Sequence, residues 1–247
     1  MGNGRRLLEY RLDEATNVQE SSSVLMTELG FFDDIDQLIL DFLNRGDKLR
    51  AGESKHYVLC SLVRTQLTKS CNNMLRHHVG DAFAAMRLAT DAALFSLLMS
   101  HGMLSENDYL TSRRARDDAV RVLGQRIKAG VPFPPIILAI RQVRSDHSSH
   151  AHADPIALAN RIKRLPGGSI KYSGFQRIDD LVDFRYFFMG MLWVAGMCFR
   201  GFLHVQEIEF AEDVSPFLTR LNDWKGALHS HRRSIGIFPE RGDEAGF

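Results

Sequence analysis

Apolar residues recur at three- and four-residue steps along most of the chain, which is the spacing of one face of an α-helix. In one early segment Ile35, Leu38, Ile39 and Phe42 follow these steps, and Gly46 ends the run. The same pattern, bounded by glycines, prolines and capping residues, predicts helices over residues 31–45, 53–78, 81–100, 105–129, 136–146, 155–163, 180–205 and 214–230.

Helices joined by such short connections pack as an antiparallel bundle, so we predict an all-α fold of seven to nine helices. At most one small β-hairpin is expected, near residues 165–175, where Pro166 and Gly174 fit turns. Gly190, Gly196 and Gly201 lie in the most apolar helix, where glycine costs stability. We therefore expect a neighbouring helix to approach closely there.

The polarity of the chain divides it into three parts. Residues 1–30 are polar and predict a weakly ordered N-terminal arm with at most a short helix. Residues 31–234 carry the helical pattern and predict a single helical domain. Residues 235–247 predict a loose C-terminal tail.

Composition favours a soluble cytoplasmic protein. Of 247 residues, 45% are hydrophobic and 25% are charged, and the net charge of +1 excludes an overall basic excess. The odd set of Cys60, Cys71 and Cys198 indicates reduced, buried thiols. The long uncharged run Tyr186–Phe199 is too short to cross a bilayer, so no membrane association is predicted.

Three histidines, His147, His150 and His152, fall close together after an apolar helix. Imidazole binds metals and moves protons near neutral pH. With Asp146 or Asp154 as an oxygen ligand, the segment could hold zinc, but it matches no standard spacing and no His-Glu-x-x-His motif is present. We therefore assign no metal and no cofactor; a polar helix end is the simpler interpretation.

The same segment pairs an arginine with a histidine. Arg144 and His150 are separated by five residues, and Arg141 and His147 form an alternative frame with the same separation. This spacing resembles the Arg-x(4–6)-His motif of the HEPN superfamily (higher eukaryote and prokaryote nucleotide-binding domains), all-α bundles of which many cleave RNA without a metal. The resemblance implies that Arg144 binds phosphate and that His150 acts as acid or base on the ribose 2′-hydroxyl. The resemblance also implies a homodimer. The chain departs from the motif at Ser145, because the family usually has Asn, Asp or His directly after the arginine.

A second polar feature lies on a helix of small and apolar residues. Arg87 and Asp91 are four residues apart, so their side chains can meet. An arginine–acid helix followed by a Ser-x-x-x-His segment resembles uncharacterised bacterial helical families, which implies one polar centre of Arg87, Asp91 and His150 or His152 inside the bundle. A buried structural network that fixes helix register is the alternative.

The segment from Arg113 to Lys128 is rich in arginine but interleaved with aspartates, as in a solvated face with internal ion pairs. It becomes a phosphate-contacting surface if Arg114, Arg121 and neighbouring cations converge. These patterns fit an RNA- or nucleotide-directed HEPN-like protein, either a metal-independent ribonuclease or a degenerate relative. They also fit a non-catalytic interaction or scaffold protein and, less directly, a His-ligated metal protein, so enzyme and non-enzyme both remain open.

Overall fold

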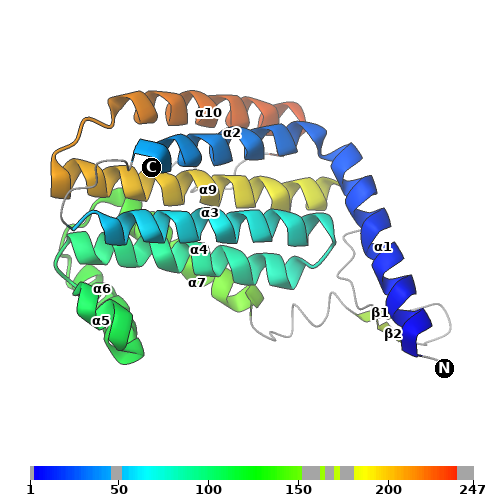
Figure 1. Cartoon of the computed structure of the whole chain (residues 1–247), viewed down its shortest axis with the longest axis horizontal. Coiled ribbons are helices and arrows are strands. Elements are labelled where there is room, and N and C mark those ends of the chain that lie inside the picture. Colours follow the sequence, from blue (N-terminus) through cyan, green and yellow to red (C-terminus); the bar gives the residue numbers. More distant parts are fainter. Residues whose placement is uncertain (1–2, 46–51, 152–161, 165–169, 173–180, 238–247) are drawn as a thin grey trace.

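The structure, a computed structural model, describes residues 3–45, 52–151, 162–164, 170–172 and 181–237. Within these residues the chain forms nine α-helices and a two-stranded hairpin, which confirms the predicted all-α bundle (Figure 1). The elements are α1 (Asn3–Val24), α2 (Met26–Leu43), α3 (Ser54–Leu75), α4 (Val79–Ser100), α5 (Glu106–Thr111), α6 (Arg113–Lys128), α7 (Pro135–Ala151), β1 (Ile162–Arg164), β2 (Ile170–Tyr172), α9 (Leu181–Phe210) and α10 (Ser215–Ser234).

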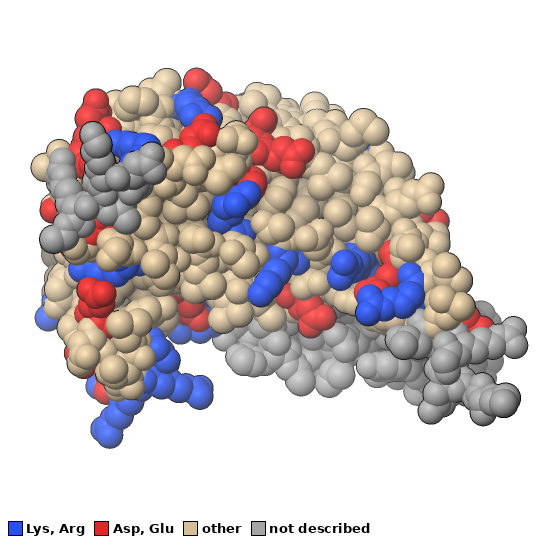
Figure 2. All heavy atoms as spheres, in the orientation of Figure 1, with Lys and Arg blue, Asp and Glu red and all other residues tan. Residues whose placement is uncertain are grey.

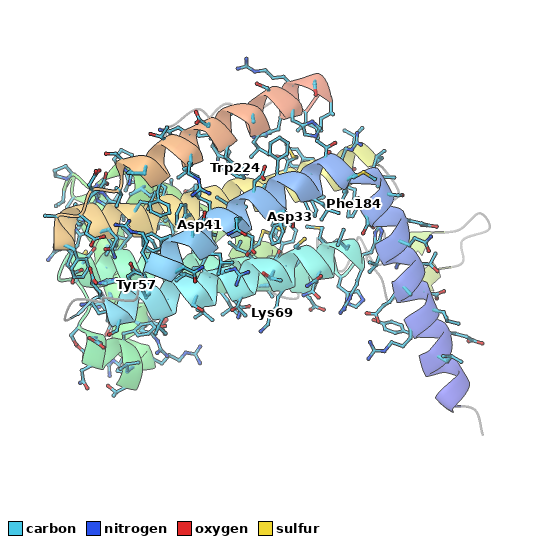
Figure 3. All side chains as sticks on the ribbon, turned by 45° about the horizontal axis from the view of Figure 1, so that its top comes forward. Asp33, Asp41, Tyr57, Lys69, Phe184 and Trp224 are labelled. Carbon is cyan, nitrogen blue, oxygen red and sulfur yellow. The ribbon has the colours of Figure 1, made fainter. Side chains whose placement is uncertain are left out.

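Helix α9 forms the centre of the bundle and contacts α2, α3, α4, α7 and α10 (Figure 1). It is buried around its whole circumference from Met191 to Phe199, as expected for a helix enclosed by others. On the outer layer, Trp224 of α10 points toward α2 and donates its indole N–H to the Phe31 carbonyl at 2.9 Å (Figure 3). The core is therefore one continuous cluster around α9.

Close packing at the α4–α7–α9 junction depends on Gly201. A Cβ at this position would lie 3.0 Å from Ile140 Cδ1 and 3.4 Å from Leu97 Cδ1. The predicted close approach is correct at Gly201 and wrong at Gly190, where a Cβ would meet nothing within 4 Å. This junction fixes α7 against α4, and so positions the polar residues described below.

Helices α4 and α9 are each long and apolar enough to cross a membrane. However, 78% of the apolar window of each is buried inside the protein. Their apolar surface is therefore largely used in internal packing.

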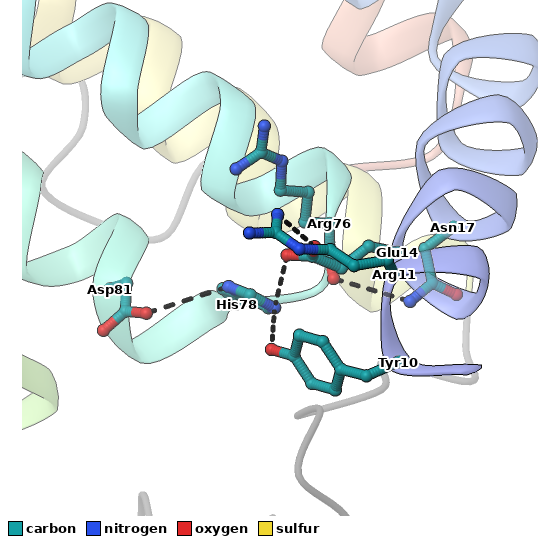
Figure 4. A network of polar contacts seen from close by, with 7 residues as sticks. All are labelled: Tyr10, Arg11, Glu14, Asn17, Arg76, His78 and Asp81. Atoms are coloured by element: carbon teal, nitrogen blue, oxygen red, sulfur yellow. Dashed lines mark hydrogen bonds and ion pairs between the residues drawn. The ribbon is translucent and has the colours of Figure 1, made fainter. Parts of the chain in front are cut away.

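The N-terminal segment differs from the prediction: it forms α1, a 22-residue helix, and not a weakly ordered arm. Its polar residues Tyr10, Glu14, Asn17 and Ser21 recur at four-, three- and four-residue steps and so share one helix face. That face meets the turn between α3 and α4 (Figure 4). Our prediction missed it because the periodic residues are polar.

Two histidines of that turn hold α1. His78 Nε2 lies 3.1 Å from the Tyr10 hydroxyl and 3.4 Å from Glu14 Oε1, and its Nδ1 lies 3.8 Å from Asp81 (Figure 4). His77, with a left-handed φ of 61°, contacts the Ser21 hydroxyl at 3.2 Å and stacks on the Phe184 ring. Side-chain contacts to one turn thus order α1.

Two further boundaries differ from the predictions. The predicted helix 105–129 is split at Ser112, whose backbone is extended and whose hydroxyl accepts the Ala115 N–H to cap α6. Helix α7 continues to Ala151, beyond the predicted end at 146.

The hairpin pairs Ile162 with Tyr172 in antiparallel register, three residues earlier than predicted. Of the predicted helix 155–163, the last two residues belong to β1 and the rest lie outside the described residues, as do residues 238–247 of the predicted tail.

Candidate functional site

One carboxylate brings two helices together. Asp91 of α4 accepts the Nε–H of Arg87 at 3.2 Å through Oδ2 and the Nε–H of Arg144, from α7, through Oδ1. Arg87 Nη1 also donates to the backbone carbonyl of Arg144 at 2.9 Å. We call these three residues the Asp91 cluster. The predicted polar centre joined Arg87 and Asp91 to His150 or His152, whose side chains lie outside the described part of the chain; in the described part, Asp91 joins Arg87 to Arg144.

The Asp91 cluster is half-buried and not sealed inside the bundle. The side chains of Arg87, Asp91 and Arg144 are 19%, 22% and 18% exposed. Asp91 engages Arg144 through its Nε edge, which leaves the terminal Nη groups for other acceptors. The carboxylate therefore orients two guanidiniums without using all of their donors.

These donors face a cleft of about 820 Å³ between α3, α4, α5, α6 and α7. Its lining is made of Leu62, Gln66, Ala84, Arg87, Leu88, Asp91, Ala92, Phe95, Tyr109, Arg113, Arg116, Asp117 and Arg144. Four arginines against two aspartates give the lining a formal charge of +2. We call it the arginine cleft; its volume suits a ligand of nucleotide size, and its charge favours an anion.

Helix α6 supplies the second pair of cations. Arg116 donates to the Tyr109 carbonyl and lies over the Tyr109 ring, 5.5 Å from the centroid. Arg113 is largely exposed, and its nearest acid is Asp117 at 3.9 Å. In Figure 2, basic side chains project from the body at the lower left, where α5 and α6 lie in Figure 1, while charges elsewhere on this face are mixed.

The structure places Arg114 and Arg121, proposed from sequence as phosphate-binding residues, outside the arginine cleft. Both pair with Asp118, at 3.8 and 3.1 Å, and Arg114 is 93% exposed. Residues three or four apart share a helix face, so 113, 116 and 117 line the cleft while 114, 118 and 121 lie on the adjacent face. The phosphate-contacting role of Arg114 and Arg121 stays a prediction; the arginines of α6 that line the cleft are Arg113 and Arg116.

The alternative arginine also points elsewhere. Arg141 lies against α6, where a Cβ at Gly124 would be 3.1 Å from its Nη2. It does not line the arginine cleft. The frame that starts at Arg144 is therefore the one that reaches the cleft.

The histidines fall at the edge of the described chain. His147 and His150 lie in the last turns of α7, with side chains outside the described part, and His152 lies outside the described residues altogether. At roughly 100° per residue, position 150 is about 120° from position 144 around the helix axis, whereas position 147 is about 60° away. The helical backbone thus brings position 147 nearer to the Arg144 face.

A second arginine–carboxylate group was not predicted from the sequence. Glu28 of α2 is fully buried and lies 3.2 Å from Arg185 Nε and 3.0 Å from His231 Nε2. Its signal was present, because Glu28 lies at helical spacing from Leu25, Phe32 and Ile35 on the buried face of α2. The Glu28 cluster, defined as Glu28, Arg185 and His231, joins α2, α9 and α10.

A buried serine–histidine–carboxylate chain was also missed. His56 Nδ1 lies 2.7 Å from the Ser96 hydroxyl, and its Nε2 lies 3.0 Å from Glu209, which also pairs with Lys55. Burial lowers the pKa of His56, against the opposing effect of Glu209. Ser96 has no exposed surface, so no substrate reaches it, and the chain joins α3, α4 and α9.

Cysteine and metal chemistry do not appear in the described part of the chain. Burial raises the pKa of the Cys71 and Cys198 thiols to about 12, and no three His, Cys, Asp or Glu side chains among the described residues could hold a metal ion. Compared with protein-family models, curated proteins and solved structures, the chain matches none. Function must therefore be argued from the arginine cleft itself.

Proposed function

We propose that the arginine cleft binds a phosphate-bearing ligand, an RNA segment or a nucleotide, through Arg144 and Arg87. The observation that carries this is the Asp91 cluster, in which one carboxylate orients two guanidiniums toward a cleft with a formal charge of +2. Guanidinium donors in a fixed fork match phosphate oxygens. The apolar part of the lining, from Leu62, Leu88 and Phe95, provides a surface for a base or ribose.

The proposal extends to metal-independent RNA cleavage, as the HEPN resemblance implies. In this extension Arg144 stabilises the charge that develops on the phosphate, and a histidine of the 147–152 segment moves the 2′-hydroxyl proton. His150 is the residue that the motif names, and His147 is the one nearer to Arg144 around the axis of α7.

Binding is tested with a fluorescent single-stranded RNA and, separately, with ATP. Arg144→Ala is expected to weaken binding of one of them at least tenfold, because charge-assisted hydrogen bonds contribute about 1.5–3 kcal/mol. Arg114→Ala is the matched control, since it removes an arginine from the face beside the cleft. Equal affinities of the wild type and Arg144→Ala for both ligands would overturn the proposal.

Cleavage is tested on the same RNA in the presence of EDTA. Arg144→Ala and either His150→Ala or His147→Ala are expected to abolish cleavage while the helical circular-dichroism signal is retained. Binding without cleavage in the wild type assigns the degenerate, non-catalytic form and removes the ribonuclease extension.

A non-catalytic interaction function is the second candidate, favoured by exposed apolar residues on the helices that form the cleft. Val58, Leu88 and Leu110 are 67%, 51% and 68% exposed. A single exposed apolar residue is ordinary, whereas several on neighbouring helices suit a protein partner. Val58→Ser with Leu110→Ser leaves RNA affinity unchanged if the arginines carry the function, and reduces binding of a protein partner if these residues do.

A further inference from the structure

Two histidines meet where α4 ends, outside the arginine cleft. The rings of His101, which follows α4, and His204 of α9 are stacked, with centroids 6.0 Å apart. The Nε2 atom of each is buried and has no hydrogen-bond partner among the described residues. The charged groups beside the pair are Arg200 and Glu207 of α9, with Glu207 3.7 Å from His204 Nδ1 and 3.0 Å from Arg200.

This histidine pair favours the uncharged state. Burial lowers the pKa of both rings, and Arg200 and His101 lower that of His204 further, while Glu207 opposes them. Protonation adds an N–H at a buried Nε2 that has no acceptor there, and it places two cations side by side. The contact is therefore stable at neutral pH and strained in acid.

One member of the histidine pair, His101, lies directly before α5 and α6, the two helices that form one wall of the arginine cleft. Directly after His101, Gly102 turns the chain with a φ of +64° into α5 and α6, which carry Tyr109, Arg113 and Arg116. The wall also packs on the core through Leu104, Ala119 and Leu123 and through the Phe95–Tyr109 ring contact.

We propose that the His101–His204 contact is an acid-sensitive latch that holds the α5–α6 wall in place and releases it when both rings are protonated. The latch stands on its own geometry, whereas its effect on a ligand rests on the proposed function of the arginine cleft. With a depressed folded pKa, the stabilisation is present above the unfolded value of about 6.5 and is lost as the pH falls through the folded pKa.

The test is hydrogen exchange of the full chain at pH 7.5 and 5.5, corrected for intrinsic exchange rates. Protection of residues 102–128 is expected to fall about tenfold between these pH values in the wild type. The double variant His101→Gln/His204→Gln, which cannot titrate, is expected to lose this pH dependence, while His229→Gln on α10 keeps it. The single variants test the latch separately if the double variant does not fold.

Wild-type protection that is independent of pH, or a pH dependence retained in the double variant, would overturn the latch. RNA affinity at the two pH values tests the coupling. RNA affinity is expected to be lower at pH 5.5 than at pH 7.5 in the wild type and not in the double variant. Protonation of other histidines adds positive charge and would by itself raise the affinity for a polyanion, so a fall in affinity points to the latch. If no RNA binds at any pH, the proposed function fails while hydrogen exchange still decides the latch; if RNA binds with the same affinity throughout, the coupling fails.

Discussion

The Asp91 cluster and the Glu28 cluster use the same chemistry in different surroundings. Each joins a carboxylate to basic side chains from other turns or helices, at 3.0 to 3.2 Å for the Glu28 contacts and 3.2 Å for Arg87–Asp91. Glu28 has no exposed surface, whereas the side chain of Asp91 is 22% exposed and lines a cleft. The two clusters therefore differ in the solvent exposure of the carboxylate and not in its pairing with basic side chains.

The difference indicates what each cluster is for. A charge with no access to water must be paired at all times, so the Glu28 cluster serves the packing of α2, α9 and α10. At the cleft the arginines keep donors that a ligand can use, because Asp91 holds them by one edge. Four changes, from the largest expected effect to the smallest, test this contrast.

Glu28→Ala is expected to lower the free energy of unfolding by about 3 kcal/mol or more, because it removes a fully buried carboxylate shared by Arg185 and His231 and leaves the space it filled empty. Urea denaturation measures the change. Asp13→Ala, at an exposed position on α1, is the control and should be close to the wild type. A loss below about 1 kcal/mol would contradict the structural role of the Glu28 cluster.

Asp91→Ala is expected to cost less, about 1–2 kcal/mol, because the Asp91 carboxylate is itself partly exposed, so that solvent already weakens its ion pairs and can fill the space it leaves. Unlike Glu28→Ala, it should also weaken RNA or nucleotide binding about tenfold, since Arg87 and Arg144 lose their common anchor. Asp91→Asn, which keeps one acceptor, should lie between. Unchanged affinity in Asp91→Ala would make the two clusters equivalent and purely structural.

Ser96→Ala is expected to cost about 1 kcal/mol, since it removes the partner of His56 Nδ1 and leaves that buried atom unpaired. Thermal or urea unfolding shows the loss. Because this contact is sealed from solvent, ligand affinity should not change; a loss of affinity without a loss of stability would indicate a role that its burial does not suggest.

Arg114→Ala and Arg121→Ala should each change the free energy of unfolding by less than about 0.5 kcal/mol, because their pairs with Asp118 are exposed to solvent. Their effect on RNA affinity should be smaller than that of Arg113→Ala. The opposite order would restore the sequence-based assignment of phosphate contacts.

The prediction from sequence succeeded where a regularity in one segment was sufficient. Apolar spacing predicted the bundle, and the four-residue step between Arg87 and Asp91 predicted their contact. It failed for α1, whose periodic residues are polar, and for Glu28, whose position on the apolar face was not recognised as burial of a charge.

Local sequence determined the helices, because backbone hydrogen bonds and side-chain periodicity act over a few residues. Which arginine of α6 faces the cleft, whether Arg144 reaches Asp91 across 53 positions, and which carboxylate is sealed were decided only when the helices packed. The physical reason is that burial and charge pairing depend on neighbours distant in sequence, and packing around α9, with Gly201 admitting Ile140 of α7, sets those neighbours.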